Sequence, residues 1–327
     1  MTESLDAHES DEIDDLISIG TDEESTEEIP VIERDKKVQW LELAGSSFLF
    51  ASAYLLLYIL YDFVTALAAA HFGLEPVLFY DTIRFENNDG WYPHCVKRVF
   101  VVGAIAMGFL GAFFYILYLI LRKSYIFVRL FMLWGSLISF AILAQRMMSV
   151  PFAGNFEYRR LDSLGMELAI FTSYMYYKPS TEWAIGFLGF LLIIGIGILY
   201  AKPFLQTAWS SKQIGSEKER LKFLRYQVLL PVVFGALAVT AVVWDTNAIP
   251  NMISYVATLI CLLVMIVHAM LMGSFKIPRQ KTWERWPIVP TIVFILVIVA
   301  IKTVLTTGIV IPNPEIYRIL EVTPSDL

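Results

Sequence analysis

Seven long apolar stretches most constrain how this chain can fold. A membrane-spanning helix needs about 20 mostly apolar residues, because the hydrocarbon core of a bilayer is about 30 Å thick and a helix rises about 1.5 Å per residue. The stretches that qualify are Leu43–Ala70, Val99–Leu121, Tyr125–Gln145, Trp183–Ala201, Val228–Trp244, Met252–Met272 and Ile288–Ile309. The sequence therefore predicts an all-α fold, a polytopic transmembrane bundle of about seven helices.

The overall composition supports a membrane protein. Hydrophobic residues make up 57% of the chain and charged residues only 17%, which is far more apolar than an ordinary soluble domain. The fifth stretch is the shortest, and it contains Pro231 and Gly235. Because proline lacks a backbone N–H, we expect a bent helix there, whose freed backbone groups find partners inside the bundle.

The N-terminal residues 1–40 differ sharply from the rest. Met1–Glu28 holds twelve acidic residues and no Lys or Arg, so removing this charge from the net −6 leaves +6 for the remainder. We expect a disordered acidic cytoplasmic tail, followed by a transmembrane domain at 41–311 and a short C-terminal tail at 312–327. The tail is either simply solvated or, through residues 1–30, a docking peptide for a protein partner. An N-terminus this acidic does not suit a secretory signal peptide.

The distribution of Lys and Arg predicts the orientation. With the N-terminus cytoplasmic and the C-terminus outside, fifteen Lys and Arg residues fall in inner segments and eight in outer ones, as the positive-inside rule requires. We expect an integral membrane protein, in a bacterial inner membrane, whose partner is the lipid bilayer and not nucleic acid. Cys95, placed in a loop, and Cys261, inside an apolar run, do not support a disulfide framework.

Three further features bear on this topology. Leu164–Tyr177 is apolar but only about 14 residues long, which suits an interfacial or re-entrant helix better than a crossing. The basic segment EKERLKFLR (217–225) suits either a helix on an anionic leaflet or a plain positive-inside determinant. The glycines of GFLGFLLIIGIG (186–197) and at positions 103, 108 and 111 indicate close helix packing.

Ionisable residues inside the spans are candidates for function, because each costs roughly 2.5–3.5 kcal/mol on insertion scales. Asp62 and Lys302 both fall in the outer halves of their helices, at similar depths, and can form an ion pair between the first and last spans. Alternatively, Asp62 faces a cavity as a functional carboxylate, or each side chain snorkels separately. His268, near the inner end of the sixth span, suits a hydrogen-bonded packing residue, and the alternative is a ligand or proton carrier.

The loop from His71 to Lys97 is the densest polar cluster. Val77–Phe85 alternates apolar and polar residues, and ENNDG follows, so we expect a short strand or hairpin after the first helix. The weak metal candidates here are His71, Asp81 and His94. They lack a recognised ligand spacing, so no cofactor is predicted and a plain capping loop is expected. Zinc binding is the alternative.

One family resemblance involves the first two spans. YDFVTALAAAHFGLEPV (61–77), then strand-like residues, then VFVVGAIAMGFLGAFF (99–114) resembles the opening of site-2-protease-type intramembrane metalloproteases. Aligning on Gly73 puts Asp62 at the family's catalytic Glu, and Tyr61 and Thr65 at its two zinc-binding His positions. LDSLG (161–165) is similar to the family's L-D-G-G ligand motif and keeps Asp162. The resemblance implies a degenerate, non-catalytic relative that retains a cleft for a membrane segment.

Three function classes follow. The first is a non-catalytic membrane protein that binds a membrane segment or a protein partner. The second is a transporter or channel subunit that uses Asp62 and Lys302. The third is a membrane-embedded hydrolase with an atypical site, whose catalytic candidates are Asp62 and Asp162. We favour the first class, and the absence of the zinc-protease motif argues against the third.

Overall fold

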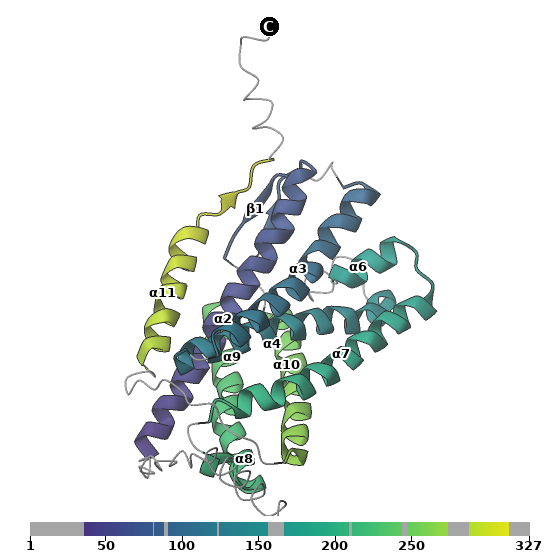
Figure 1. Cartoon of the computed structure of the whole chain (residues 1–327). Helices are drawn as coiled ribbons and strands as arrows, with labels where there is room; N and C mark the ends of the chain where they lie inside the picture. The colour runs from purple at the N-terminus through teal and green to yellow at the C-terminus, as the bar shows by residue number, and fades with distance from the viewer. Residues whose placement is uncertain are drawn as a thin grey trace, which may run out of the picture. The chain divides into compact units, whose positions relative to one another are not determined.

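A computed structural model describes residues 36–80, 82–87, 91–122, 124–155, 167–208, 211–243, 248–273 and 288–313. The predictions for residues 1–35 of the acidic tail, for Asp81, for Asp162 with its LDSLG motif, and for residues 314–327 lie outside these residues. The last five residues of the predicted tail, 36–40, are helical and not disordered, because they begin the first long helix. Within the described residues the chain is dominated by helices (Figure 1).

The described elements follow one another in this order. They are α2 (Lys36–His71), β1 (Pro76–Leu78), β2 (Ile83–Phe85), α3 (Pro93–Ile120), α4 (Ile126–Ser149), η2 (Val150–Asn155), α6 (Glu167–Tyr174), α7 (Pro179–Leu205), η3 (Ser211–Ile214), α8 (Glu217–Leu224), η4 (Arg225–Leu229), α9 (Leu230–Val242), α10 (Ala248–Leu271), α11 (Ile288–Leu305) and β3 (Ile309–Val310).

Seven helical segments of the described chain are long and apolar enough to cross a membrane, counting the continuous α8–η4–α9 as one. The predicted transmembrane bundle is thereby confirmed. Helix α6 has only eight residues, about 12 Å, which is too short to cross. The segment EKERLKFLR does not form a separate surface helix, because it makes the first turns of the fifth span.

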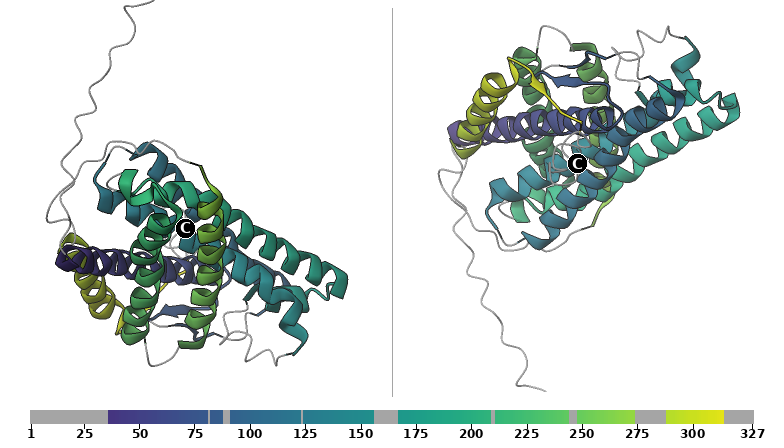
Figure 2. Two further views of the ribbon diagram at one scale, coloured as in Figure 1. Left: turned by 90° about the horizontal axis from the view of Figure 1, so that it is seen from below. Right: turned by 90° about the horizontal axis from the view of Figure 1, so that it is seen from above.

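Helix α4 occupies the middle of the bundle. It packs against α3, α7 and α10, and the views of Figure 2 show α4 and α7 side by side. Its Trp134 is fully buried between Phe50 of α2 and Phe204 of α7, with ring centroids 5.3 and 4.8 Å away. Helix α11 is the least buried of the seven and contacts α2 through stacked rings of Phe294 and Phe48.

The fifth span contains the predicted irregularity. Its helix widens to a π-turn at η4, directly before Pro231. Proline cannot donate to the carbonyl group four residues earlier, which belongs to Gln227. That carbonyl accepts a hydrogen bond from the Ser46 hydroxyl of α2, at 3.0 Å. The freed backbone group thus finds its partner inside the bundle, as expected.

The small sheet has three strands in the order β2-β1-β3. Strands β1 and β2 are antiparallel, with Val77 opposite Arg84 and Leu78 opposite Ile83. The predicted hairpin is therefore present, but its turn lies at Phe79–Thr82, inside the alternating run, and not at the ENNDG segment. Strand β3, which follows α11, pairs with the other edge of β1 and was not predicted.

The glycines of α7 mostly mark close helix contacts, as the sequence indicates. A Cβ at Gly189 would lie 2.8 Å from the Ala144 carbonyl oxygen of α4, and one at Gly197 would lie 2.7 Å from Val264 of α10. Gly195 is different, because nothing lies within 4 Å of its added Cβ. Packing thus requires glycine at particular positions of the glycine-rich run and not at all of them.

Candidate functional site

A cluster of buried polar side chains lies where α2, α4 and α6 meet. Arg146, in the last turn of α4, is 8% exposed and forms an ion pair with Glu167, the first residue of α6. Its guanidinium carbon lies 5.1 Å from the centre of the Tyr61 ring of α2, and Tyr61 also lies beside Glu167. One charged pair and one phenol therefore connect three helices.

Asp62 belongs to the same cluster. It is half-buried beside Tyr61, and it interacts electrostatically with both Tyr61 and Arg146. The predicted third span ends at Gln145, which leaves Arg146 among the eight outer cations, but α4 continues to Ser149 and includes Arg146. The apolar residues that follow Arg146 were the available signal for this longer helix.

The two positions aligned with zinc-binding histidines form a tight helix contact. A Cβ at Gly103 of α3 would lie 2.6 Å from the Tyr61 ring and 2.9 Å from Oγ1 of Thr65. The Thr65 hydroxyl donates to the Tyr61 carbonyl at 2.9 Å within α2. The Tyr61 ring, the Thr65 hydroxyl and helix α3 thus fill this space together. No space is left among these described residues for a metal ion with a bound water and a substrate.

The other intramembrane candidates occupy different surroundings. The Lys302 ammonium of α11 lies 3.5 Å from the centre of the Tyr80 ring, a cation–π contact at the end of β1. His268 is half-buried in the last turn of α10. The structure thus places the Lys302 charge on the small sheet, while Asp62 faces the Arg146 cluster.

The loop histidines pack against an aromatic ring. His71 ends α2, His94 lies in the first turn of α3, and their ring centroids are 5.2 and 5.7 Å from that of Phe72. Cys95 also belongs to this first turn and not to a loop, and it is buried with a free thiol, as is Cys261. Among the described residues, no three His, Cys, Asp or Glu side chains gather in a way that could hold a metal ion.

Gln145 is a second buried polar residue that the sequence did not single out. It lies next to Arg146 on α4 and is 4% exposed. Neither its amide oxygen nor its amide nitrogen has a hydrogen-bond partner among the described residues. An unpaired buried amide costs roughly 1–3 kcal/mol. Such a group is therefore a position where a water, an ion or a transported solute gains a hydrogen bond.

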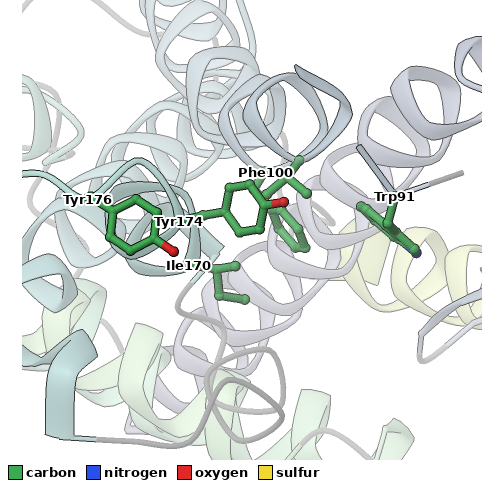
Figure 3. Close-up of a pocket in the computed structure, with 6 residues that line it drawn as sticks. Trp91, Phe100, Ile170, Tyr174 and Tyr176 are labelled. Carbon is green, nitrogen blue, oxygen red and sulfur yellow. The ribbon is translucent and has the colours of Figure 1, made fainter. Parts of the chain in front are cut away.

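An aromatic pocket of about 410 Å³ lies between the start of α3 and the end of α6. Figure 3 shows its side chains, with Phe100 and Tyr174 near the centre, Tyr176 to one side and Trp91 to the other. Trp91 is held in place from two sides, because it stacks on Phe100 with centroids 5.6 Å apart and meets the edge of Phe85 of β2 at 5.1 Å. This wall of the pocket is therefore preformed.

Tyr176 is the most unusual residue of the pocket. It follows α6 with a φ of +53°, in the left-handed region where helix ends usually carry glycine. A side chain there costs about 1–2 kcal/mol. Its backbone N–H donates to the Ser173 carbonyl at 3.1 Å at the end of the helix, and the residue is 91% exposed. The fold thus holds a large apolar ring outward at an energetic cost.

Comparison with known proteins identifies no relative. No protein-family model, no curated protein and no solved structure matches the chain. The geometry of these two places, the Arg146 cluster and the aromatic pocket, is therefore the basis for a functional proposal.

Proposed function

We propose that this protein is a non-catalytic integral membrane protein that binds an apolar membrane segment of a partner protein in the aromatic pocket between α3 and α6. The observation that carries the proposal is Tyr176, an exposed tyrosine held in a strained backbone conformation at the pocket's edge. Strain of this kind gathers at binding and catalytic sites, where function outweighs its cost.

The chemistry of the pocket favours a protein segment as its occupant. Trp and Tyr are the residues most enriched at binding hot spots, because they bury a large area and lose little side-chain freedom. The Trp91 side of the pocket is fixed by Phe85 and Phe100, so less ordering entropy opposes binding. Because the protein lies in a membrane, the apolar segments of other membrane proteins are candidate partners.

The interior supports a binding role over hydrolysis. Tyr61, Thr65 and Gly103 pack closely together, and Tyr61 and Thr65 are the two positions that the resemblance aligns with zinc-binding histidines. A degenerate descent from that family, with a retained cleft for a membrane segment, is part of the same proposal. The N-in, C-out orientation is a further part, and it places the pocket at the outer face of the membrane.

Two substitutions of Tyr176 test the proposal in the full-length protein in its own membrane. A photo-crosslinking phenylalanine analogue at position 176 should form a discrete protein adduct, and one at Phe187, which is 60% exposed on α7, should label lipid. Identification of the adduct by mass spectrometry names the partner. Lipid labelling at both positions, or an adduct between two copies of this chain, would overturn the proposal.

The second substitution separates binding from stability. Tyr176→Gly removes the ring and relieves the left-handed strain, so the unfolding temperature should stay the same or rise. Binding of the identified partner should nevertheless fall at least tenfold, as for a hot-spot residue. Unchanged binding would show that Tyr176 is not the contact.

A second candidate function is proton or ion movement through the Arg146 cluster. Gln145 favours it, because both ends of its buried amide are without a partner among the described residues. Proteoliposomes with a pH-sensitive dye would test it. Gln145→Leu and Asp62→Asn should each abolish dissipation of a pH gradient, and Lys178→Gln, an exposed cation, should not. No dissipation by the unaltered protein would exclude proton movement.

A further inference from the structure

A second pocket, of about 450 Å³, lies between the end of α2, the first turns of α3 and one residue of α6. Its lining separates into two parts. Three cationic or ionisable side chains lie at the surface, and the remainder is almost wholly apolar. The lining residues are Ala68, His71, Phe72, Lys97, Arg98, Val101, Val102, Ile105 and Phe171. This pocket is distinct from the aromatic pocket and has a different chemistry.

The cationic part concentrates positive charge at one helix end. Lys97 and Arg98 are exposed in the second turn of α3, one turn beyond the helix N-terminus, whose dipole favours an anion. The first turn of α3 contains no acidic residue, and none of the described lining residues is a carboxylate. The two neighbouring cations repel one another, so a bound anion stabilises both.

The cations are also oriented by the pocket. The Arg98 guanidinium carbon lies 5.7 Å from the centre of the Phe72 ring, which also contacts the His71 ring. This cation–π contact restricts Arg98 without neutralising it. Its donors remain able to bind phosphate oxygens, for which the planar guanidinium is well suited.

The apolar part continues from this charged mouth along α3. Val101, Val102 and Ile105 follow Arg98 by about one and two turns, toward the centre of the apolar helix. A phosphate site followed by an apolar groove that runs into the membrane matches the shape and chemistry of a phospholipid. We infer that this pocket binds an anionic phospholipid, with its phosphate on Lys97 and Arg98 and an acyl chain along Val101 and Ile105.

The experiment measures lipid retention by the full-length, detergent-purified protein with native mass spectrometry. Phosphatidylglycerol and phosphatidylcholine are titrated separately. We expect phosphatidylglycerol to remain bound to the unaltered protein at energies that strip phosphatidylcholine. Lys97→Gln with Arg98→Gln should weaken phosphatidylglycerol binding about thirtyfold, since each cation near an anionic headgroup contributes about fivefold.

A matched control removes two cations that do not line the pocket. Arg84 of β2 and Lys178 before α7 are both exposed, and the double change Arg84→Gln with Lys178→Gln should leave retention unchanged. An equal loss in this control would overturn the proposal, because net charge alone would then explain binding. Equal retention of the two lipids by the unaltered protein would overturn it as well.

A third variant tests the acyl-chain groove and distinguishes a lipid from a free phosphate. Val102→Trp fills the groove and keeps both cations, so phosphatidylglycerol binding should fall while the protein still folds, as judged by its unfolding temperature. Glycerol phosphate, which has no acyl chain, should not compete. Competition by glycerol phosphate, or full lipid binding by the Val102→Trp variant, would reduce the site to a simple anion site and overturn the lipid assignment.

Discussion

Side-chain hydrogen bonds to freed carbonyl groups stabilise two irregular places in this bundle. The Ser46 hydroxyl donates to the Gln227 carbonyl, which Pro231 leaves without its helical partner. The Arg220 guanidinium donates to carbonyls at the end of α10. A carbonyl group that lies in hydrocarbon without a partner cannot bind water instead, so losing these hydrogen bonds is costly.

Replacing Ser46 by alanine should lower the free energy of unfolding by about 1–2 kcal/mol, because the Gln227 carbonyl would then be buried without a partner. Ser52 is the matched control. Its buried hydroxyl donates at 2.7 Å to the Phe48 carbonyl of its own helix, so Ser52→Ala should cost less than about 0.5 kcal/mol. Denaturant titration in detergent micelles measures both. Equal losses of stability would show that the Ser46–Gln227 hydrogen bond between helices contributes no more than the Ser52–Phe48 bond within one helix.

Replacing Arg220 by lysine should lower the free energy of unfolding by about 2 kcal/mol. The guanidinium donates to the carbonyls of Ile214, Ala269 and Gly273, at 2.7, 3.3 and 3.4 Å, and a single ammonium cannot reach all of them. The exposed Arg225 provides the control, where the same change to lysine should have no measurable effect. The same micelle titration distinguishes them, and a tolerated Arg220→Lys would contradict this capping role.

At the scale of elements, close contact between helices sets where glycine is required. Helices α7 and α4 approach so closely at Gly189 that a methyl group has no space, whereas Gly195 on the same helix faces open space. Packing between membrane helices depends on such approach, because lipid tails are as apolar as the side chains themselves.

Two alanine substitutions on α7 should therefore have opposite effects. Gly189→Ala should destabilise the bundle by about 1–3 kcal/mol, since the new methyl group would lie 2.8 Å from both the Ala144 carbonyl oxygen and the Met147 Cβ. Gly195→Ala should be neutral or stabilise by up to about 1 kcal/mol, from better helix propensity. Thermal unfolding in detergent measures both. Similar effects at the two positions would argue against the close α4–α7 contact.

At the scale of the whole molecule, the Arg146–Glu167 pair connects the bundle interior to the aromatic pocket. Glu167 begins α6, and α6 carries Tyr174 and leads into Tyr176. Removing one partner of a buried ion pair leaves an uncompensated charge, which costs about 3–5 kcal/mol, whereas replacing both by apolar residues is often nearly neutral.

Arg146→Met alone should therefore destabilise the protein by about 3–5 kcal/mol, and Arg146→Met with Glu167→Leu should recover most of that loss. Because α6 loses its charged attachment in both variants, cross-linking from position 176 should fall in both. Stability and cross-linking yield, measured on the same preparations, separate the two effects. A double variant as unstable as the single one would contradict direct pairing.

The sequence by itself determined the membrane class, the seven spans, the irregular fifth helix and the hairpin after the first span. Each of these features depends on composition or on local spacing. Apolar length predicts the spans, a proline predicts the irregular helix, and an alternating run predicts the hairpin. Only the tertiary structure decided that Arg146 turns inward to Glu167, that Lys302 lies on Tyr80, that β3 joins the sheet, and that Trp91 and Tyr176 line one pocket. These contacts join residues far apart in the chain, and no local pattern records which distant side chains will meet.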